Sequence, residues 1–143
     1  MKTSLRTVPD TNVIVAAQSA NVTSPNREYF ERWKNEEFAL LFSDDTLHEY
    51  IEKLVERSVP KEIIIQLVVA ILEMGTSTAI QFFHLAKYPV DPDDIAFILC
   101  AENGNATHLI SYDPHLLDLN GFYQFKICKT LDFLFELRQI LSE

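Results

Sequence analysis

Glycine and cysteine are both scarce in this chain of 143 residues. Only three glycines occur, and no glycine-rich linker, repeat or low-complexity tract divides the sequence, so we expect one domain across residues 1–143. The two cysteines, Cys100 and Cys128, lack the spacing of a metal site. We therefore expect two reduced thiols in the hydrophobic core.

Long hydrophobic runs are also missing. The run over residues 63–72 is interrupted by Gln66 and is too short to span a bilayer. The N-terminus has no hydrophobic signal region, so we expect a cytoplasmic protein without membrane contact. An apolar content of 48% is nevertheless enough to build a globular core.

Positive charge is the third deficit, because 12 Lys and Arg stand against 21 Asp and Glu, which gives a net charge of -9. This balance argues against a protein that holds nucleic acid through a general basic surface. Carboxylates that bind divalent cations would cancel part of the negative charge. The remainder would suit a basic protein partner.

Strand-like apolar segments alternate with helical ones along the whole chain. The alternation predicts an α/β fold with a mostly parallel sheet and helices on both faces. The helix expected at 60–74 is so apolar that we predict burial on more than one side or a dimer contact. The expected strands are 5–9, 37–42, 78–85, 107–111 and 125–128, and the expected helices are 12–19, 26–34, 44–57, 60–74, 92–103, 114–119 and, after the cap Thr130, 131–141, with a loop at 21–25.

Acidic residues recur where the predicted strands end. Asp10 follows the first strand, Asp113 follows the fourth, and Asp91 and Asp94 open the helix after the third. Glu49 lies one to two turns into the helix after the second strand. Because the carboxyl ends of parallel strands share one edge, adjacent first and fourth strands would bring Asp10 and Asp113 face to face.

Three or four carboxylates at one edge would form a site for Mg²⁺ or Mn²⁺, which prefer oxygen ligands. Such an ion lowers the pKa of a bound water, and a second ion can stabilise the leaving oxygen of a phosphodiester. Helical spacing places Asp91 and Asp94 on one face of their helix and predicts that Asp93 points elsewhere.

Helix capping is the simpler explanation for these acids. Asp91 and Asp113 each precede a proline, which is the usual pattern at a helix N-terminus. Asp94 could serve the amides of the same first turn. Glu49 lies too deep in its helix to be a cap.

Four stretches resemble the motifs of PIN-domain nucleases, in the order of that family. Residues 10–17 (Asp-Thr-Asn-Val-Ile-Val-Ala-Ala) resemble the opening motif, and residues 43–54, which include Glu49, resemble the second. Residues 91–101 and 109–117 resemble the third and fourth. The sequence is most similar to the bacterial group of toxin components of toxin-antitoxin systems (VapC-like).

The resemblance implies a five-stranded parallel sheet of order 3-2-1-4-5 and metal-dependent cleavage of RNA. Asn12 matches the polar residue that orients the first acid, and Ser111 matches the small hydroxyl residue before the last one. Asp91 matches an acid that is frequent in this group, for which we expect a capping or more distant supporting role. The catalytic and metal-binding quartet of the family is matched by Asp10, Glu49, Asp94 and Asp113.

The resemblance also implies partners. A toxin would bind a basic antitoxin near the acidic edge, and a homodimer through residues 60–74 is plausible on the same ground. Tyr112 stands where the family often has glycine, which would make the loop less open or offer a ring for base stacking. The basic residues available for RNA capture are Arg27, Arg32, Lys34, Lys53 and Arg57, although a solvated surface is the simpler expectation for them.

Three functions therefore remain in order of preference. The first is an endoribonuclease for single-stranded RNA, and the second is a catalytically inactive PIN-like binding or interaction module whose acids are caps. The third is a phosphatase with Asp10 as covalent nucleophile. It ranks last because Asn12 stands where such sites usually have a second Asp.

Overall fold

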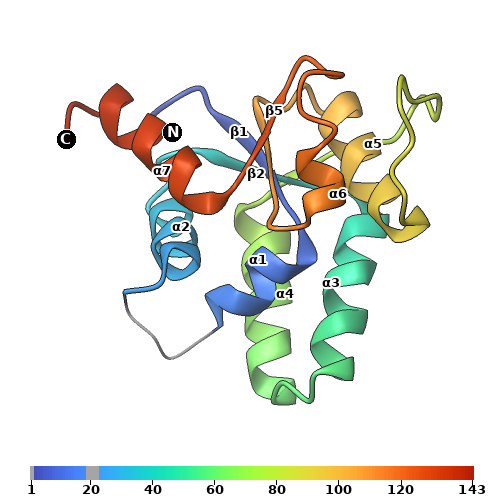
Figure 1. Ribbon diagram of the computed structural model, residues 1–143. Helices are drawn as coiled ribbons and strands as arrows, with labels where there is room; N and C mark the ends of the chain where they lie inside the picture. Colours follow the sequence, from blue (N-terminus) through green and yellow to red (C-terminus); the bar gives the residue numbers. More distant parts are fainter. Residues whose placement is uncertain (1, 19–22) are drawn as a thin grey trace.

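The computed structural model describes residues 2–18 and 23–143 and has one parallel sheet at its centre (Figure 1). The strand order is β3-β2-β1-β4-β5, and every pair of neighbours runs parallel. The α/β class and the order 3-2-1-4-5 are thereby confirmed. The strands are β1 (Arg6–Pro9), β2 (Ala39–Phe42), β3 (Thr76–Ser77), β4 (His108–Ile110) and β5 (Lys126–Cys128).

Helices cover the two faces of the sheet. On one face, α2 and α7 pack together, with Tyr29 and Phe133 meeting Phe38 in an aromatic cluster. Helix α5 packs against β1, β2 and β4. The helices are α1 (Thr11–Ala17), α2 (Pro25–Lys34), α3 (Asp44–Glu56), α4 (Lys61–Met74), α5 (Ile95–Asn103), α6 (Pro114–Leu117) and α7 (Thr130–Ile140), with a 3-10 turn η1 (Pro92–Asp94) before α5.

Most expected helix ends agree with the structure within a few residues, as is usual for capped termini. Thr130 is the first residue of α7 instead of its cap, and its hydroxyl donates to Asn26 Oδ1 at 2.6 Å. The expected end of the first helix at Ser19 lies outside the described residues, as does part of the loop expected at 21–25.

The strand expected at 78–85 is wrong. The sheet pairs only Thr76–Ser77 with β2, and the chain then leaves it. The side chain of Asn103 explains the difference, because its Oδ1 accepts from the N–H groups of Gln81 and Phe82 and its Nδ2 donates to the carbonyl of Phe82. Because β2 ends at Phe42, which pairs with Ser77, a strand over 79–85 would have no neighbour there, and Asn103 supplies hydrogen bonds to these backbone groups instead.

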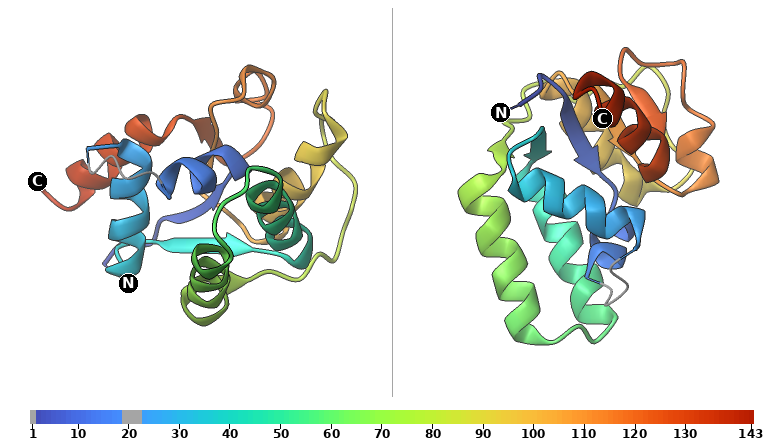
Figure 2. Two further views of the ribbon diagram at one scale, coloured as in Figure 1. Left: turned by 90° about the horizontal axis from the view of Figure 1, so that it is seen from below. Right: turned by 90° about the vertical axis from the view of Figure 1, so that its left-hand side faces the viewer.

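Helices α3 and α4 form an antiparallel hairpin that extends beyond the sheet (Figures 1 and 2). Helix α4 buries Leu67 and Ile71, whereas Ile65, Val69 and Leu72 are exposed on its other side. Within residues 2–18 and 23–143, no helix is both long and apolar enough to cross a membrane.

Helix α3 begins with a capping box that fixes its position against β2. The Ser43 hydroxyl accepts from the Thr46 N–H at 3.2 Å, and the Thr46 hydroxyl accepts from the Ser43 N–H at 2.9 Å. Both residues are buried, so each amide would otherwise be left without a partner.

We expect Ser43→Ala to lower the free energy of unfolding by about 1 kcal/mol, because the Thr46 amide loses its acceptor. Ser43→Thr, which keeps the hydroxyl, should lose less. Urea denaturation followed by circular dichroism measures both. Equal stability of the alanine variant and the parent would contradict this role for the capping box.

Candidate active site

The register between β1 and β4 sets the relative position of Asp10 and Asp113. Pro9 pairs with Ile110, so Asp10 and Ser111 are the next residues of neighbouring parallel strands. The Ser111 hydroxyl donates to Asp10 Oδ2 at 2.8 Å and accepts from the Asp113 N–H at 2.9 Å. One small hydroxyl therefore joins the two acids that end β1 and β4.

Three of these acids also act as helix caps. Oδ1 of Asp10, Asp91 and Asp113 accepts a backbone N–H of the following turn, at 2.7, 3.0 and 2.9 Å respectively. The capping explanation is correct for Asp91 and Asp113 and wrong for Asp94, whose side chain caps no helix amide. Capping takes Oδ1 in each case, and the Oδ2 atoms remain for other contacts.

A cavity of about 270 Å³ brings the expected acids together. It includes the four residues of the predicted quartet and Asp91, and it also includes Asp93 and Glu56. The expectation that Asp93 points elsewhere is wrong, because Asp93 also lines the cavity and its carboxylate contributes to the raised pKa of Glu49. The lining residues are Asp10, Thr11, Asn12, Glu49, Lys53, Glu56, Arg57, Asp91, Asp93, Asp94, Phe97 and Asp113.

Asp94 and Asp10 are the buried acids of this cavity, with 7% and 5% of their surface exposed. Burial raises the pKa of Asp94 to about 8, and the neighbouring carboxylates of Asp10 and Asp113 add to the shift. Burial also raises the pKa of Asp10, against the opposing effect of its hydrogen bonds from Ser111 and Thr11.

Among the described residues, Asp94 Oδ2 is the buried side-chain atom that has no hydrogen-bond partner. The carboxyl group of Asp113 is one of the causes that raise the pKa of Asp94, since two ionised carboxylates in one cavity repel each other. A proton or a cation is therefore needed to offset the repulsion between them.

Glu49 reaches the cavity from α3. Its pKa is raised by burial first and then by the carboxylates of Asp93 and Glu52. The effect of Asp93 on Glu49 shows that the two carboxylates are neighbours, because like charges raise each other's pKa. The acidic lining of the cavity therefore includes residues of α3.

The chemistry of the lining fits a hard divalent cation. Carboxylate oxygens dominate it, and neither His nor Cys contributes. The unpartnered Asp94 Oδ2 is an available ligand atom. In the described part of the chain, however, no three His, Cys, Asp or Glu side chains are already spaced as a ligand set, so binding a cation requires the carboxylates to move closer together.

The basic residues fall into two groups. Lys53 and Arg57 line the acidic cavity, and Arg57 Nη2 donates to Asn12 Oδ1 at 3.0 Å. Arg32 instead forms ion pairs with carboxylates elsewhere on the molecule, at 2.6 to 2.9 Å. Lys34 lies over the ring of Phe30 and is also outside the cavity.

Tyr112 lies beside the site without lining it. Its hydroxyl donates to Asn26 Oδ1 at 3.2 Å, and 38% of its surface is exposed. The hydrogen bond holds the ring toward α2, so the position expected to be open in this family is filled by an anchored aromatic side chain.

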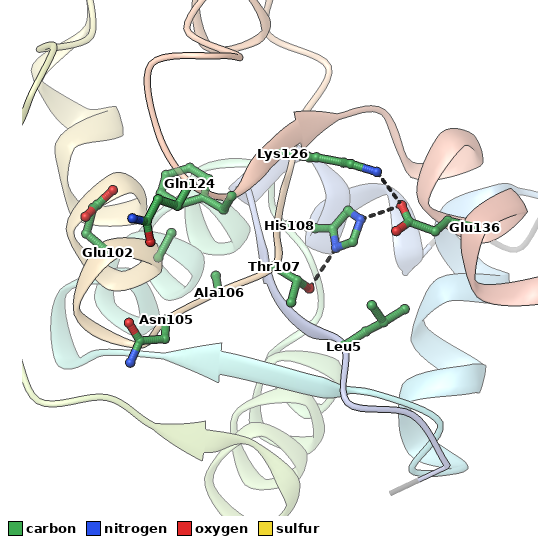
Figure 3. Close-up of a pocket in the computed structure, with 11 residues that line it drawn as sticks. Leu5, Glu102, Asn105, Ala106, Thr107, His108, Gln124, Lys126 and Glu136 are labelled. Carbon is green, nitrogen blue, oxygen red and sulfur yellow. Dashed lines mark hydrogen bonds and ion pairs between the residues drawn. The ribbon is translucent and has the colours of Figure 1, made fainter. Parts of the chain in front are cut away.

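A second cavity, of about 380 Å³, lies at the opposite, amino-terminal edge of the strands (Figure 3). His108 lies between two partners there, with Nδ1 at 2.8 Å from the Thr107 hydroxyl and Nε2 at 2.7 Å from Glu136. Lys126 also pairs with Glu136, at 3.4 Å. Burial lowers the pKa of His108. The contacts of His108 and Lys126 with Glu136 join β4 and β5 to α7.

Sequence reasoning missed the contributions of Glu56 and Asp93 and did not separate Lys53 and Arg57 from the other basic residues. The spacing along α3 held the missing signal. Residues four apart lie on one face of a helix, so the spacing places Lys53 and Arg57 on the same face as Glu49.

The geometry agrees with the comparison with known families. A family model described as "PIN domain" matches residues 6–115, a range that contains all four acids of the predicted quartet. No curated protein matches the chain. Proteins with a PIN domain are generally nucleases that use divalent metal ions. The match covers more than half of the chain, and the protein belongs to the PIN-domain family.

Proposed function

We propose that this protein, as a single PIN-like domain over residues 1–143, is a metal-dependent endoribonuclease that cleaves single-stranded RNA in the cytoplasm. The observation that carries the proposal is the buried Asp94 Oδ2, which has no partner within the described residues and lies in a cavity shared with Asp10, Asp113 and Glu49. Such an atom is costly unless a cation or a proton occupies the site.

The proposed ligands for Mg²⁺ or Mn²⁺ are Asp10, Asp94 and Asp113, and Glu49 completes the set from α3. A divalent cation supplies Lewis acidity that activates water and offsets the charge on the phosphate. Ser111 holds the Asp10 carboxylate in place through its 2.8 Å hydrogen bond.

Two further residues support the site. Asp91 caps η1 and adds negative charge at the cavity wall. Asn12 accepts a hydrogen bond from Arg57, and we propose that it helps to orient Asp10.

We further propose that the protein is the toxin of a VapC-like toxin-antitoxin pair. A net charge of -9 and an acidic cavity favour a basic antitoxin. The exposed Ile65, Val69 and Leu72 of α4 are candidates for a homodimer contact.

A catalytically inactive binding module is the second candidate. The hydrogen bonds from Oδ1 of Asp10, Asp91 and Asp113 to helix amides favour it, because they give these acids a structural role without any metal. Only metal binding and cleavage distinguish the two.

We expect Asp10→Asn to reduce RNA cleavage about 100-fold or more, because the substitution removes a negatively charged ligand of the cation that offsets the charge on the phosphate. Cleavage of an unstructured and a structured RNA in Mn²⁺, with a chelator control, measures this. Asp45→Asn, which changes an exposed acid of α3 outside the cavity, is the matched control.

Isothermal titration with Mn²⁺ separates the nuclease from the binding module. The nuclease proposal predicts a saturable Mn²⁺ site whose affinity falls in Asp113→Asn but not in Asp45→Asn. No saturable binding by the parent, or an Asp10→Asn variant that cleaves as fast as the parent, would refute the assignment.

We expect the metal-free protein to lose stability as the pH rises from about 4 to about 8. The pKa of Asp94 is about 8 in the folded state against 3.8 without the fold, so unfolding in this range releases a proton, and higher pH favours release. Asp94→Asn removes this titration and should melt about 5 °C above the parent at pH 8.

Thermal melts in a chelator at pH 5 and pH 8 measure this difference. Asp45→Asn should behave like the parent at both values. If Asp94→Asn and the parent lost stability in parallel between pH 5 and pH 8, the buried charge of Asp94 would not be the cause.

A further inference from the structure

The acidic cavity would repel the phosphates of an RNA substrate. Seven carboxylic side chains line it, and a nucleic acid strand carries one negative charge per phosphate. Cations held by the carboxylates would offset repulsion only near the cleaved bond. The flanking phosphates need basic side chains of the protein.

Lys53 and Arg57 are the basic side chains that line this cavity. They follow Glu49 at intervals of four residues along α3, so the three side chains share one face of the helix. Each interval corresponds to about 6 Å along the helix axis. The face therefore changes from acidic near the middle of α3 to basic at its C-terminal end, where Arg57 is the C-cap.

Arg57 is held in place and keeps most of its hydrogen-bonding capacity. Its Nη2 donates to Asn12 Oδ1 at 3.0 Å, two residues after Asp10. A guanidinium has five N–H donors, and in the described part of the chain Arg57 is not within ion-pair distance of any carboxylate. It is also exposed, so a ligand can reach it.

Lys53 is available as well, since its contact is an ion pair with Glu56 at 3.3 Å on the helix surface. Pairs of this kind are weak and exchange readily for a more highly charged partner. By contrast, Arg32 is surrounded by Glu28, Glu37 and Glu143 and is already neutralised.

We propose that Lys53 and Arg57 form a phosphate clamp that binds the RNA backbone beside the cleaved bond and positions the strand across Asp10 and Asp94. The proposal rests on the proposed nuclease function, and it places the RNA along the α3 side of the cavity. Arg57 can bind a phosphate with two parallel N–H groups, whereas Lys53 acts as a point charge.

The test uses the full chain and a labelled unstructured RNA in Mn²⁺, with Lys53→Gln, Arg57→Gln and the double variant. We expect the double variant to raise KM by about tenfold or more, with kcat changed far less, because the residues bind substrate away from the reacting atoms. The slope of log KM against log salt concentration should fall by about 1 to 1.5 when two phosphate contacts are lost.

Lys34→Gln is the matched control, since it removes one positive charge outside the cavity. Arg57→Lys keeps the charge and should keep the salt dependence. Thermal melts by circular dichroism exclude loss of fold, which we do not expect for two side chains on the helix surface.

The outcomes separate the clamp from the function on which it rests. If the parent cleaves RNA and the double variant keeps its KM and its salt dependence, the clamp is wrong and the nuclease stands. If kcat falls while KM stays constant, the two residues act in the chemical step and the clamp is also wrong. If the parent cleaves no RNA with Mn²⁺ or Mg²⁺, both proposals fall together.

Discussion

The hydroxyl of Ser111 is the contact on which the acidic cavity depends. It donates to Asp10 and accepts from the backbone of Asp113, so it fixes two acids on adjacent strands with one side chain. The parallel register of β1 and β4 makes the contact possible. Asp94 then adds a third carboxyl group in the same cavity, and its burial beside the other acids raises its pKa to about 8. Without a bound cation the fold therefore favours a proton on Asp94, and a divalent cation can replace that proton and offset the charges of the three acids.

The architecture was predictable from the sequence because it follows from periodicity and connectivity. Alternating strands and helices require parallel pairing, and the helix starts at Ser43 and Asp113 carry ordinary cap residues. The strand expected at 78–85 failed for a reason that a local pattern does not contain. Its backbone groups bond to Asn103, which lies a full helix away in the sequence, so a tertiary contact overrode the propensity of the segment.

The site was predictable to the extent that its acids sit at strand ends. The edge of a parallel sheet gathers such residues without any knowledge of the loops, and Asp10 and Asp113, which follow β1 and β4, line one cavity. Asp94 joins them from η1, although the strand expected before it is absent. The contribution of Asp93 was not predictable from the spacing of residues 91–94 alone. Its charge acts on Glu49, which belongs to α3, and that neighbour is known only once the two segments are packed together.

The spacing along α3 limits how this part of the chain can vary in length. Glu49, Lys53 and Arg57 share a face only because each is separated by nearly one turn. A single residue inserted between Glu49 and Arg57 would rotate the basic end by about 100° around the helix axis and part it from the acids. The turn at 58–60 lies beyond this stripe and can lengthen without disturbing it. We therefore expect insertions and deletions to be tolerated at the tip of the α3–α4 hairpin and not in the part of α3 between Glu49 and Arg57.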